Sequence, residues 1–153
     1  MRVKYWMTPR VITASPEEGL KGAWRLLKEH AIRHLPVLEE GRLVGIVTDR
    51  DLRQALPSGA TALEVHELLY LLDRVTLREI MTKEVVTVTP DQSIPEAARL
   101  LLEHKIGALP VLEVDRLVGI LTETDILKAY LSLGEVSEIA PQPCWMADVA
   151  MGR

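Results

Sequence analysis

The chain contains the same segment twice. Residues 6–56 recur without a gap as residues 80–130, and about half of the aligned positions are identical. The stretch Ile32 to Glu39 (IRHLPVLE) returns as Ile106 to Glu113 (IGALPVLE). Because a unit of about 50 residues buries its apolar face poorly by itself, we expect the two copies to pack against each other. A ligand bound between them would contact two related halves.

The composition argues against several classes of protein. The net charge is −4, and the basic residues show none of the clustering that is typical of nucleic-acid binding. No apolar stretch is long enough to cross a bilayer, and the N-terminus lacks the apolar core of a signal peptide. The single cysteine, Cys144, cannot form an internal disulfide. We therefore expect a cytoplasmic protein that binds neither nucleic acid nor membrane.

Hydrophobic periodicity and turn signals predict the same order of elements in both copies. In the second copy, residues 85–88 form a short β-branched run, and Ser93 to Glu96 has the pattern of a capping box that begins a helix. Residues 109–112 and 117–121 are predicted strands, and a second helix starts near Thr122. The pattern predicts an α/β protein made of two β-α-β-β-α repeats, each with a three-stranded sheet.

These boundaries divide the chain into four parts. Residues 1–57 form repeat 1, residues 58–79 the inter-repeat linker, residues 80–131 repeat 2 and residues 132–153 a tail. Apolar residues at helical spacing predict a helix over residues 62–73 of the linker. The tail contains two prolines and no hydrophobic period, which predicts a poorly ordered end or a docking strand.

A repeated motif ends the last strand of each copy. Residues 45–51 read GIVTDRD and residues 119–125 read GILTETD, so a Thr closes the strand and an Asp follows three positions later. One interpretation is a capping box, with Thr at the N-cap and Asp one turn into the helix. The other is a ligand site, because a helix N-terminus attracts phosphate and an ionised Asp can accept two hydrogen bonds from a ribose. The sequence leaves both interpretations open.

The paired units resemble cystathionine-β-synthase (CBS) domains, two of which form a Bateman module. The resemblance covers residues 6–56 and 80–130 and rests on the h-M-T start, the h-x-x-L-P-V strand and the G-h-h-T-x-x-D end (h, hydrophobic). Within the family the chain looks most like the acetoin-utilisation regulatory proteins, which usually carry an ACT domain after the pair. Only a short tail follows the pair here. The resemblance implies two repeats packed around a pseudo-two-fold axis.

The resemblance also implies that an adenosine-containing ligand such as AMP, ADP or ATP binds in the clefts between the repeats. Asp51 and Asp125 would hold the ribose, and Thr48 and Thr122 would lie near the phosphates. The opposite repeat would supply the adenine wall, with Thr82, Thr87 and Ile106 for the cleft of Asp51, and Thr8, Thr13 and Ile32 for the cleft of Asp125.

The two residues before L-P-V, which commonly face the cleft in this family, differ between the repeats. They are Arg33 and His34 in the first repeat, and Gly107 and Ala108 in the second. With Arg50, the first pair is expected to make the cleft of the first repeat's aspartate prefer phosphorylated ligands. The other cleft would discriminate less or stay empty. An exposed strand edge is the alternative interpretation of the Arg-His pair.

No catalytic or metal-binding motif is visible, and no cofactor is expected to be required. We therefore expect a regulatory module rather than an enzyme, in which a ligand shifts the placement of the repeats and thereby affects a protein target or a second protomer. A homodimer is expected through apolar residues on the helices that follow the aspartate motifs: Leu52, Leu56, Ile126, Leu127 and Tyr130. Two alternatives remain: a structural dimerisation module with empty clefts, and an enzyme with an unrecognised site.

Overall fold

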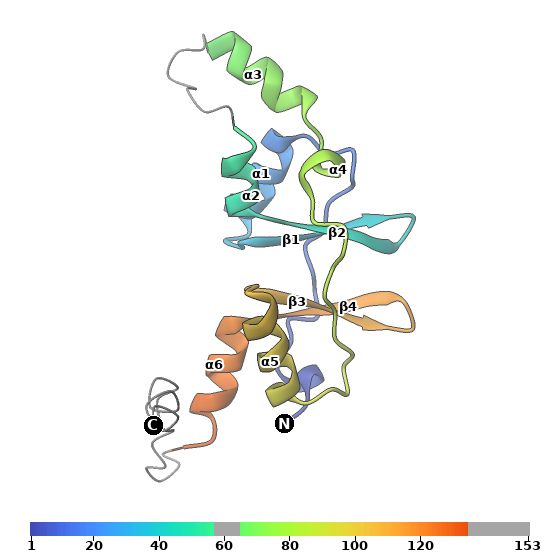
Figure 1. The fold of residues 1–153 in the computed structure, drawn as a ribbon, viewed down its shortest axis with the longest axis vertical. Helices are drawn as coiled ribbons and strands as arrows, with labels where there is room; N and C mark the ends of the chain where they lie inside the picture. The colour runs from blue at the N-terminus through green and yellow to red at the C-terminus, as the bar shows by residue number, and fades with distance from the viewer. Residues whose placement is uncertain (57–64, 135–153) are drawn as a thin grey trace, which may run out of the picture.

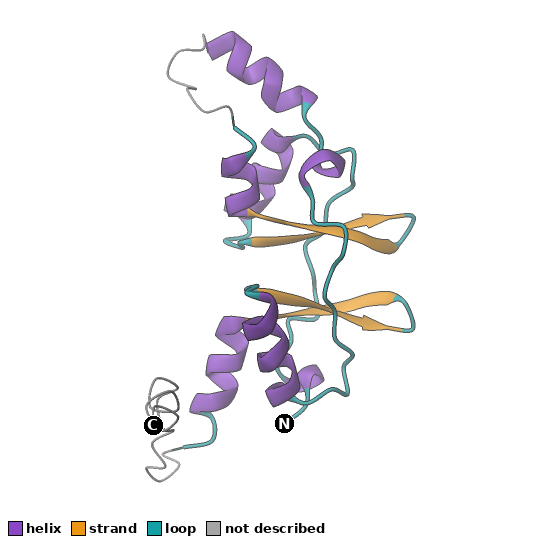
Figure 2. Ribbon diagram, viewed as in Figure 1, coloured by secondary structure: helices purple, strands orange, loops and turns teal. Residues whose placement is uncertain are grey.

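A computed structural model describes residues 1–56 and 65–134 of the chain (Figure 1). The two repeats are stacked end to end, and one β-hairpin from each repeat faces the other across the middle (Figure 2). The helices lie on the outer sides of the two hairpins, so each repeat is a small α/β unit. Residues 62–64 of the predicted linker helix and residues 135–153 of the tail, including Cys144, lie outside the described residues.

Each repeat contains a helix, an antiparallel hairpin and a second helix, in the predicted order. Repeat 1 consists of α1 (Leu20–Glu29), β1 (His34–Glu39), β2 (Arg42–Thr48) and α2 (Asp49–Gln54). Repeat 2 consists of α5 (Ile94–His104), β3 (Ala108–Glu113), β4 (Arg116–Thr122) and α6 (Glu123–Leu131). The linker contributes α3 (Val65–Arg74), which overlaps the predicted helix, and the short α4 (Leu77–Ile80). A 3-10 turn (Val3–Tyr5) lies near the N-terminus.

The segment that was predicted to be the first strand of each repeat forms only an isolated bridge. The prediction of three-stranded sheets is therefore wrong. Each described sheet has two strands, and the preceding segment joins it through a single parallel bridge, Ala14 to Val37 in repeat 1 and Val88 to Val111 in repeat 2. In repeat 1 the backbone N–H of Ala14 donates to the carbonyl oxygen of Pro36. The next bond of this ladder would need an N–H on Pro36, which proline lacks. Pro110 has the same effect in repeat 2.

Each repeat has its own hydrophobic core between its hairpin and its helices. The apolar stripe of α1 packs on the hairpin of repeat 1, and that of α5 packs on the hairpin of repeat 2. Leu52, which was expected on a dimer surface, is instead part of the first core and only 2% exposed. Ile126 is partly buried against the second core. These two residues therefore stabilise their own repeat and offer little surface to a partner.

The two repeats exchange their N-terminal segments. Thr8 pairs with Ile120 of β4 through two backbone hydrogen bonds of 2.9 and 3.0 Å, although Thr8 belongs to repeat 1 in the sequence. In the same way Thr82 pairs with Ile46 of β2 through bonds of 3.1 and 3.0 Å. Val3 continues this exchange, because it is fully buried in the core of repeat 2. Each M-T segment is therefore an edge of the opposite hairpin.

The exchange explains why a glycine begins each G-h-h-T-x-x-D motif. A Cβ atom added to Gly119 would lie 2.5 Å from the sulfur of Met7, which no folded protein tolerates without movement. A Cβ atom on Gly45 would clash with the sulfur of Met81 in the same way. The Met of each M-T segment thus packs directly on the glycine of the opposite repeat.

Substitution of Val3 tests the exchange. We expect Val3→Ala to lower the free energy of unfolding by about 1–3 kcal/mol, because two buried methyl groups are lost from the core of repeat 2. Tyr5→Ala is the matched control, since Tyr5 lies two positions away and is 73% exposed. Urea unfolding of both variants is the measurement. Equal stability of the two would show that the N-terminal segment is not docked on repeat 2.

Candidate functional site

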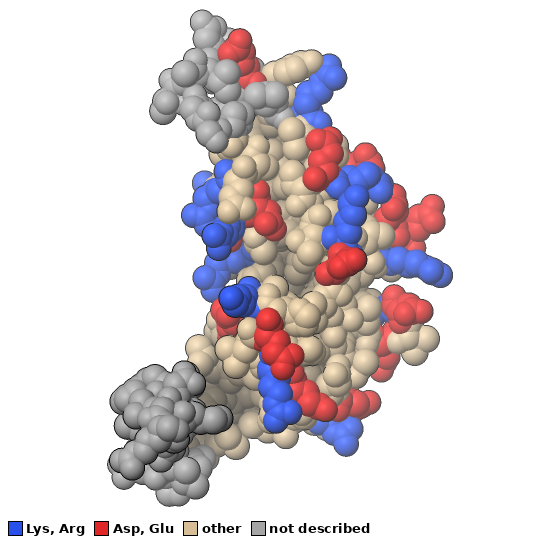
Figure 3. Space-filling model, viewed as in Figure 1, with Lys and Arg blue, Asp and Glu red and all other residues tan. Residues whose placement is uncertain are grey.

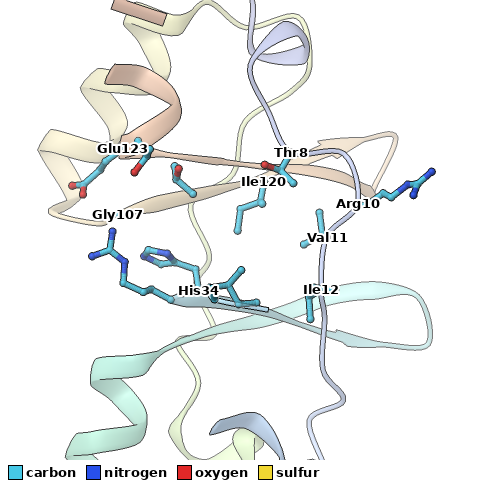
Figure 4. Close-up of a pocket in the computed structure, with 13 residues that line it drawn as sticks. Thr8, Arg10, Val11, Ile12, His34, Gly107, Ile120 and Glu123 are labelled. Carbon is cyan, nitrogen blue, oxygen red and sulfur yellow. The ribbon is translucent and has the colours of Figure 1, made fainter. Parts of the chain in front are cut away.

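A cavity of about 220 Å³ lies between the two hairpins and is open to solvent (Figure 4). Its walls come from the segment after the first M-T, from the approach to β1, and from the facing strands of repeat 2 with the start of α6. The lining residues are Thr8, Arg10, Val11, Ile12, Ala31, Ile32, Arg33, His34, Gly107, Ile120, Thr122, Glu123 and Thr124. Both repeats contribute, as expected for a site that depends on their packing.

The helix N-terminus at the cavity is held by a capping box. The backbone N–H and the hydroxyl of Thr122 both donate to Oδ2 of Asp125, each at 2.9 Å, and the N–H of Asp125 donates back to the Thr122 hydroxyl oxygen at 3.4 Å. Repeat 1 has the same arrangement, with the N–H of Thr48 at 2.9 Å from Oδ2 of Asp51. The capping-box interpretation of the motif is therefore confirmed in both repeats.

The capping boxes leave one oxygen of each aspartate for other partners. Oδ1 of Asp51 accepts no hydrogen bond from the residues that the structure describes, and Oδ1 of Asp125 lies 3.6 Å from Nζ of Lys128. Asp125 is itself only 6% exposed, so its carboxylate is fixed in position. A fixed carboxylate with one oxygen remaining can still accept a hydrogen bond from a ribose hydroxyl. The structural and the ligand-binding interpretations are therefore compatible.

Arg33 and His34 line the cavity that also contains Thr122. The sequence assigned them to the cleft of Asp51, but they line the cavity that ends at Thr122, next to Asp125. At the start of β1, His34 points across the cavity toward Gly107 of repeat 2 (Figure 4). Arg33 therefore brings a positive charge to a cavity in which the sequence had predicted only neutral residues from the second repeat.

His34 projects from β1 into the cavity and lies against Gly107 (Figure 4). A Cβ atom on Gly107 would lie 2.9 Å from Nε2 of His34, so the glycine leaves room for the imidazole. Burial lowers the pKa of His34, and the charge of Arg33 lowers it further, against the opposing effect of Asp49, Glu123 and Asp51. His34 is therefore neutral at pH 7 and acts there as a hydrogen-bonding group more than as a cation.

Sequence reasoning missed several lining residues and named others that do not reach this cavity. The lining residues that were missed are Arg10, Val11, Ile12, Ala31, Ile120 and Glu123. The duplication could have drawn attention to Arg10, because it corresponds to an acid, Glu84. Ala108 is buried in the interior. The remaining predicted residues that do not line the cavity are Thr13, Thr48, Arg50, Asp51, Thr82, Thr87, Ile106 and Asp125. Their role as ligand contacts stays a prediction.

Neither a metal site nor a membrane-spanning helix is found in the part of the chain that the structure describes. Residues 1–56 and 65–134 contain no group of His, Cys, Asp or Glu side chains arranged to hold a metal ion. Within the same ranges, no helix has both the length and the apolar character needed to span a bilayer.

The environment of His34 predicts a pH dependence. Because the pKa of His34 is lower in the folded protein than its ordinary value of about 6.5, the unfolded chain binds a proton more readily below that pH. The free energy of unfolding should therefore fall as the pH decreases from about 7 to about 5. His34→Gln should reduce this fall. Urea unfolding across this pH range is the measurement, and parallel curves for wild type and His34→Gln would contradict the assignment.

Known proteins with similar sequence and structure share this architecture. The family model of the CBS domain matches residues 3–58 and 77–132. Protein MJ1225 of Methanocaldococcus jannaschii is 35% identical over 127 residues, which cover 82% of this chain. The match covers only 45% of MJ1225, so this chain spans less than half the length of that relative. The crystal structure of MJ1225 superposes with a TM-score of 0.76 and covers 84% of this chain and 47% of the other.

Two further solved structures match nearly their whole length. The CBS domain pair of protein MJ0100, in complex with methylthioadenosine and S-adenosyl-L-methionine, is 30% identical with a TM-score of 0.73, and the match covers 87% of this chain and 98% of that one. The Vibrio cholerae protein AcuB, named for acetoin utilization, is 32% identical with a TM-score of 0.73 over 87% of this chain and 92% of that one. The duplication, the exchanged segments and the family match agree, and this chain belongs to the CBS domain family as a tandem pair.

Proposed function

We propose that this protein is a regulatory module that binds an adenosine-containing ligand in the cleft between its two CBS repeats. The observation that carries the proposal is the cavity between the hairpins, which joins apolar walls, a helix N-terminus and basic side chains. Among its relatives, the MJ0100 pair is solved with two adenosine-containing ligands, and MJ1225 is named as a candidate archaeal homologue of γ-AMPK. Adenine nucleotides and S-adenosyl compounds are therefore the ligand classes to test.

The cavity suggests how such a ligand would lie. Ile12, Ile32 and Ile120 form apolar walls that suit a flat adenine ring. The ribose would lie at the start of α6, where Oδ1 of Asp125 can accept a hydrogen bond. The group on the 5′ carbon would then extend toward Arg33 and His34.

A ligand in this position would act on the packing of the repeats. Thr8 and Ile12 belong to the segment that crosses between the repeats, and they line the same cavity as residues of β4 and α6. A ligand that fits one relative placement of the hairpins better than another would increase the population of that placement. The signal is proposed to pass to a second protomer or to a protein target, without any bond being made or broken.

A homodimer is part of this proposal. Leu102 on α5 is 78% exposed, and Leu127 on α6 is 62% exposed. Tyr130 and Leu131 are exposed beside them. Several large apolar side chains on neighbouring helices of a small protein are typical of a protein–protein interface. The rival proposal is a structural dimerisation module with empty clefts, and an enzyme with an unrecognised site is the third.

Replacement of Asp125 tests the proposed contact with the ribose. We expect Asp125→Asn to weaken binding of AMP or S-adenosyl-L-methionine by at least about tenfold, because a charge-assisted hydrogen bond contributes about 1.5–3 kcal/mol. Asn keeps the shape of the capping box, so the fold should survive. Asp115→Asn, in the exposed turn between β3 and β4, is the matched control, and Asp51→Asn reports on the equivalent position of repeat 1. Isothermal titration calorimetry is the measurement; unchanged affinity in both motif variants would leave only the capping role.

The basic side chains of the cavity predict a preference for phosphorylated ligands. We expect the wild-type protein to bind AMP and ATP more tightly than adenosine at low salt, because Arg can contact phosphate through two hydrogen bonds. The double variant Arg33→Ala/His34→Ala should lose this preference. Arg116→Ala, on the exposed hairpin of repeat 2, controls for the loss of net charge. Binding of each ligand at low and moderate salt is compared by calorimetry. A phosphate preference that persists in the double variant would place the phosphate contacts elsewhere.

A further inference from the structure

His34 lies at the contact between the two repeats. It is the first residue of β1 and pairs there with Thr48, the residue that caps α2. Its imidazole lies against Gly107 of repeat 2 (Figure 4). A Cβ atom on Gly107 would lie 2.9 Å from Nε2 of His34 and 3.6 Å from Oε2 of Glu123, at the start of α6. The imidazole is therefore surrounded by groups of both repeats.

The charged groups that face His34 come from the approach to β1, the start of α2 and the start of α6. They are Arg33, Asp49, Asp51 and Glu123, and Arg10 lines the same cavity. In the space-filling view, basic and acidic side chains lie close together where the repeats meet, on the side of α2 and α6 (Figure 3). Charges of both signs therefore act on the imidazole, and one added charge can change their balance.

In the free protein this balance keeps the imidazole neutral at pH 7. Burial is the main cause of the lowered pKa of His34, and the guanidinium of Arg33 lowers the pKa further. Asp49 and Asp51 of repeat 1 and Glu123 of repeat 2 have the opposite effect. A negative charge bound beside Arg33 would offset the guanidinium and add to the effect of the acids. Such a charge favours the protonated imidazole.

The ligand position of the proposed function places a negative charge at this point. The group on the 5′ carbon extends toward Arg33 and His34, and in a nucleotide this group is a phosphate with a charge of about −1.5 to −2 at pH 7. A phosphate accepts a hydrogen bond from an imidazolium, and hydrogen bonds between ionised groups are about twice as strong as neutral ones. Since the cavity is open to solvent, the ligand adds more negative charge than burial around the imidazole.

We propose that His34 takes up a proton when a phosphate group binds beside Arg33, so that the central cavity binds phosphorylated ligands more tightly as the pH falls. The inference rests on the proposed function and specifies how pH regulates the same site. The proton comes from the buffer, bonds to the unprotonated ring nitrogen of the imidazole, and returns to the buffer when the ligand leaves. Repeat 2 has Ala108 at the equivalent position, so the duplication supplies this group only once.

The proton uptake sets the direction of the pH dependence. The affinity for AMP rises as the pH falls through the pKa of His34 in the complex, and this contribution levels off below the lower pKa of the free protein. Between these two values the affinity changes by up to about tenfold per pH unit, which is the limit for one proton. Adenosine has no phosphate and should show no such rise. Because the acids that attract the imidazolium belong to both repeats, the proton also favours the placement of the hairpins that keeps these acids together.

Calorimetry in two buffers measures the proton uptake. Binding of AMP to the full chain is measured at about pH 7 in PIPES and in imidazole, whose different ionisation enthalpies reveal the number of protons exchanged. His34→Gln is the matched variant, because glutamine keeps a hydrogen-bonding side chain and does not titrate. The phosphate of AMP has its own pKa near about 6, but its contribution is the same for both proteins. The difference between them therefore belongs to His34.

The outcomes separate the proton uptake from ligand binding itself. The wild-type protein should take up a measurable fraction of a proton with AMP and none with adenosine, and His34→Gln should take up less with AMP. Equal uptake by the two proteins overturns the inference and leaves the proposed function intact. Absence of AMP binding to the wild-type protein also overturns the inference. In that case the proposed function survives only if S-adenosyl-L-methionine or methylthioadenosine binds.

Nuclear magnetic resonance of the imidazole groups provides a second readout that does not depend on a variant. The Cε1–H signal of His34 is assigned through the backbone resonances of the wild-type protein and followed over the pH range with and without AMP. Its titration midpoint should lie at higher pH in the complex than in the free protein, and adenosine should not raise it. A midpoint that AMP leaves unchanged or lowers contradicts the proposal.

Discussion

The exchange of the two M-T segments is the interaction on which the rest of the structure depends. Thr8 is hydrogen-bonded to β4, and Thr82 is hydrogen-bonded to β2. The edge of each hairpin is therefore paired with the segment that leads into the other repeat. The exchange fixes the distance between the hairpins, and it forces a glycine onto each facing strand because a methionine packs there. The central cavity exists because two separate cores are held face to face by these crossings.

The aspartate motif shows how one local device can serve both folding and binding. In each repeat, Oδ2 of the aspartate is used by the capping box, which holds the carboxylate in one orientation. The other oxygen is then presented at the start of a helix, beside a cavity in the case of Asp125. A capping role therefore does not argue against a ligand role, because the cap removes the conformational freedom that a ligand would otherwise have to restrict.

The sequence predicted the elements well and their assembly less well, for physical reasons. Helices and hairpins follow from periodicity and caps within a few residues of the chain, and Ser93, Thr48 and Thr122 cap helices as expected. The truncated first strand follows from Pro36, whose missing N–H matters only once the neighbouring segment is known. The cleft that contains Arg33 and His34 could not be assigned, because it depends on the direction in which β1 enters the middle of the molecule. A local sequence pattern likewise could not predict that Val3 lies in the core of repeat 2.

Native mass spectrometry of the protein with AMP, ATP, methylthioadenosine and S-adenosyl-L-methionine is the most direct test of ligand binding between the two repeats. We expect a stoichiometric complex with at least one of these adenosine compounds at micromolar concentration, and a weaker or absent complex with the corresponding guanosine compounds. The apolar walls of the cavity provide the physical basis for this discrimination, because they would leave the additional polar groups of guanine without hydrogen-bond partners. Absence of any complex with the adenosine compounds at millimolar concentration would contradict a ligand-binding role and favour a structural module with empty clefts.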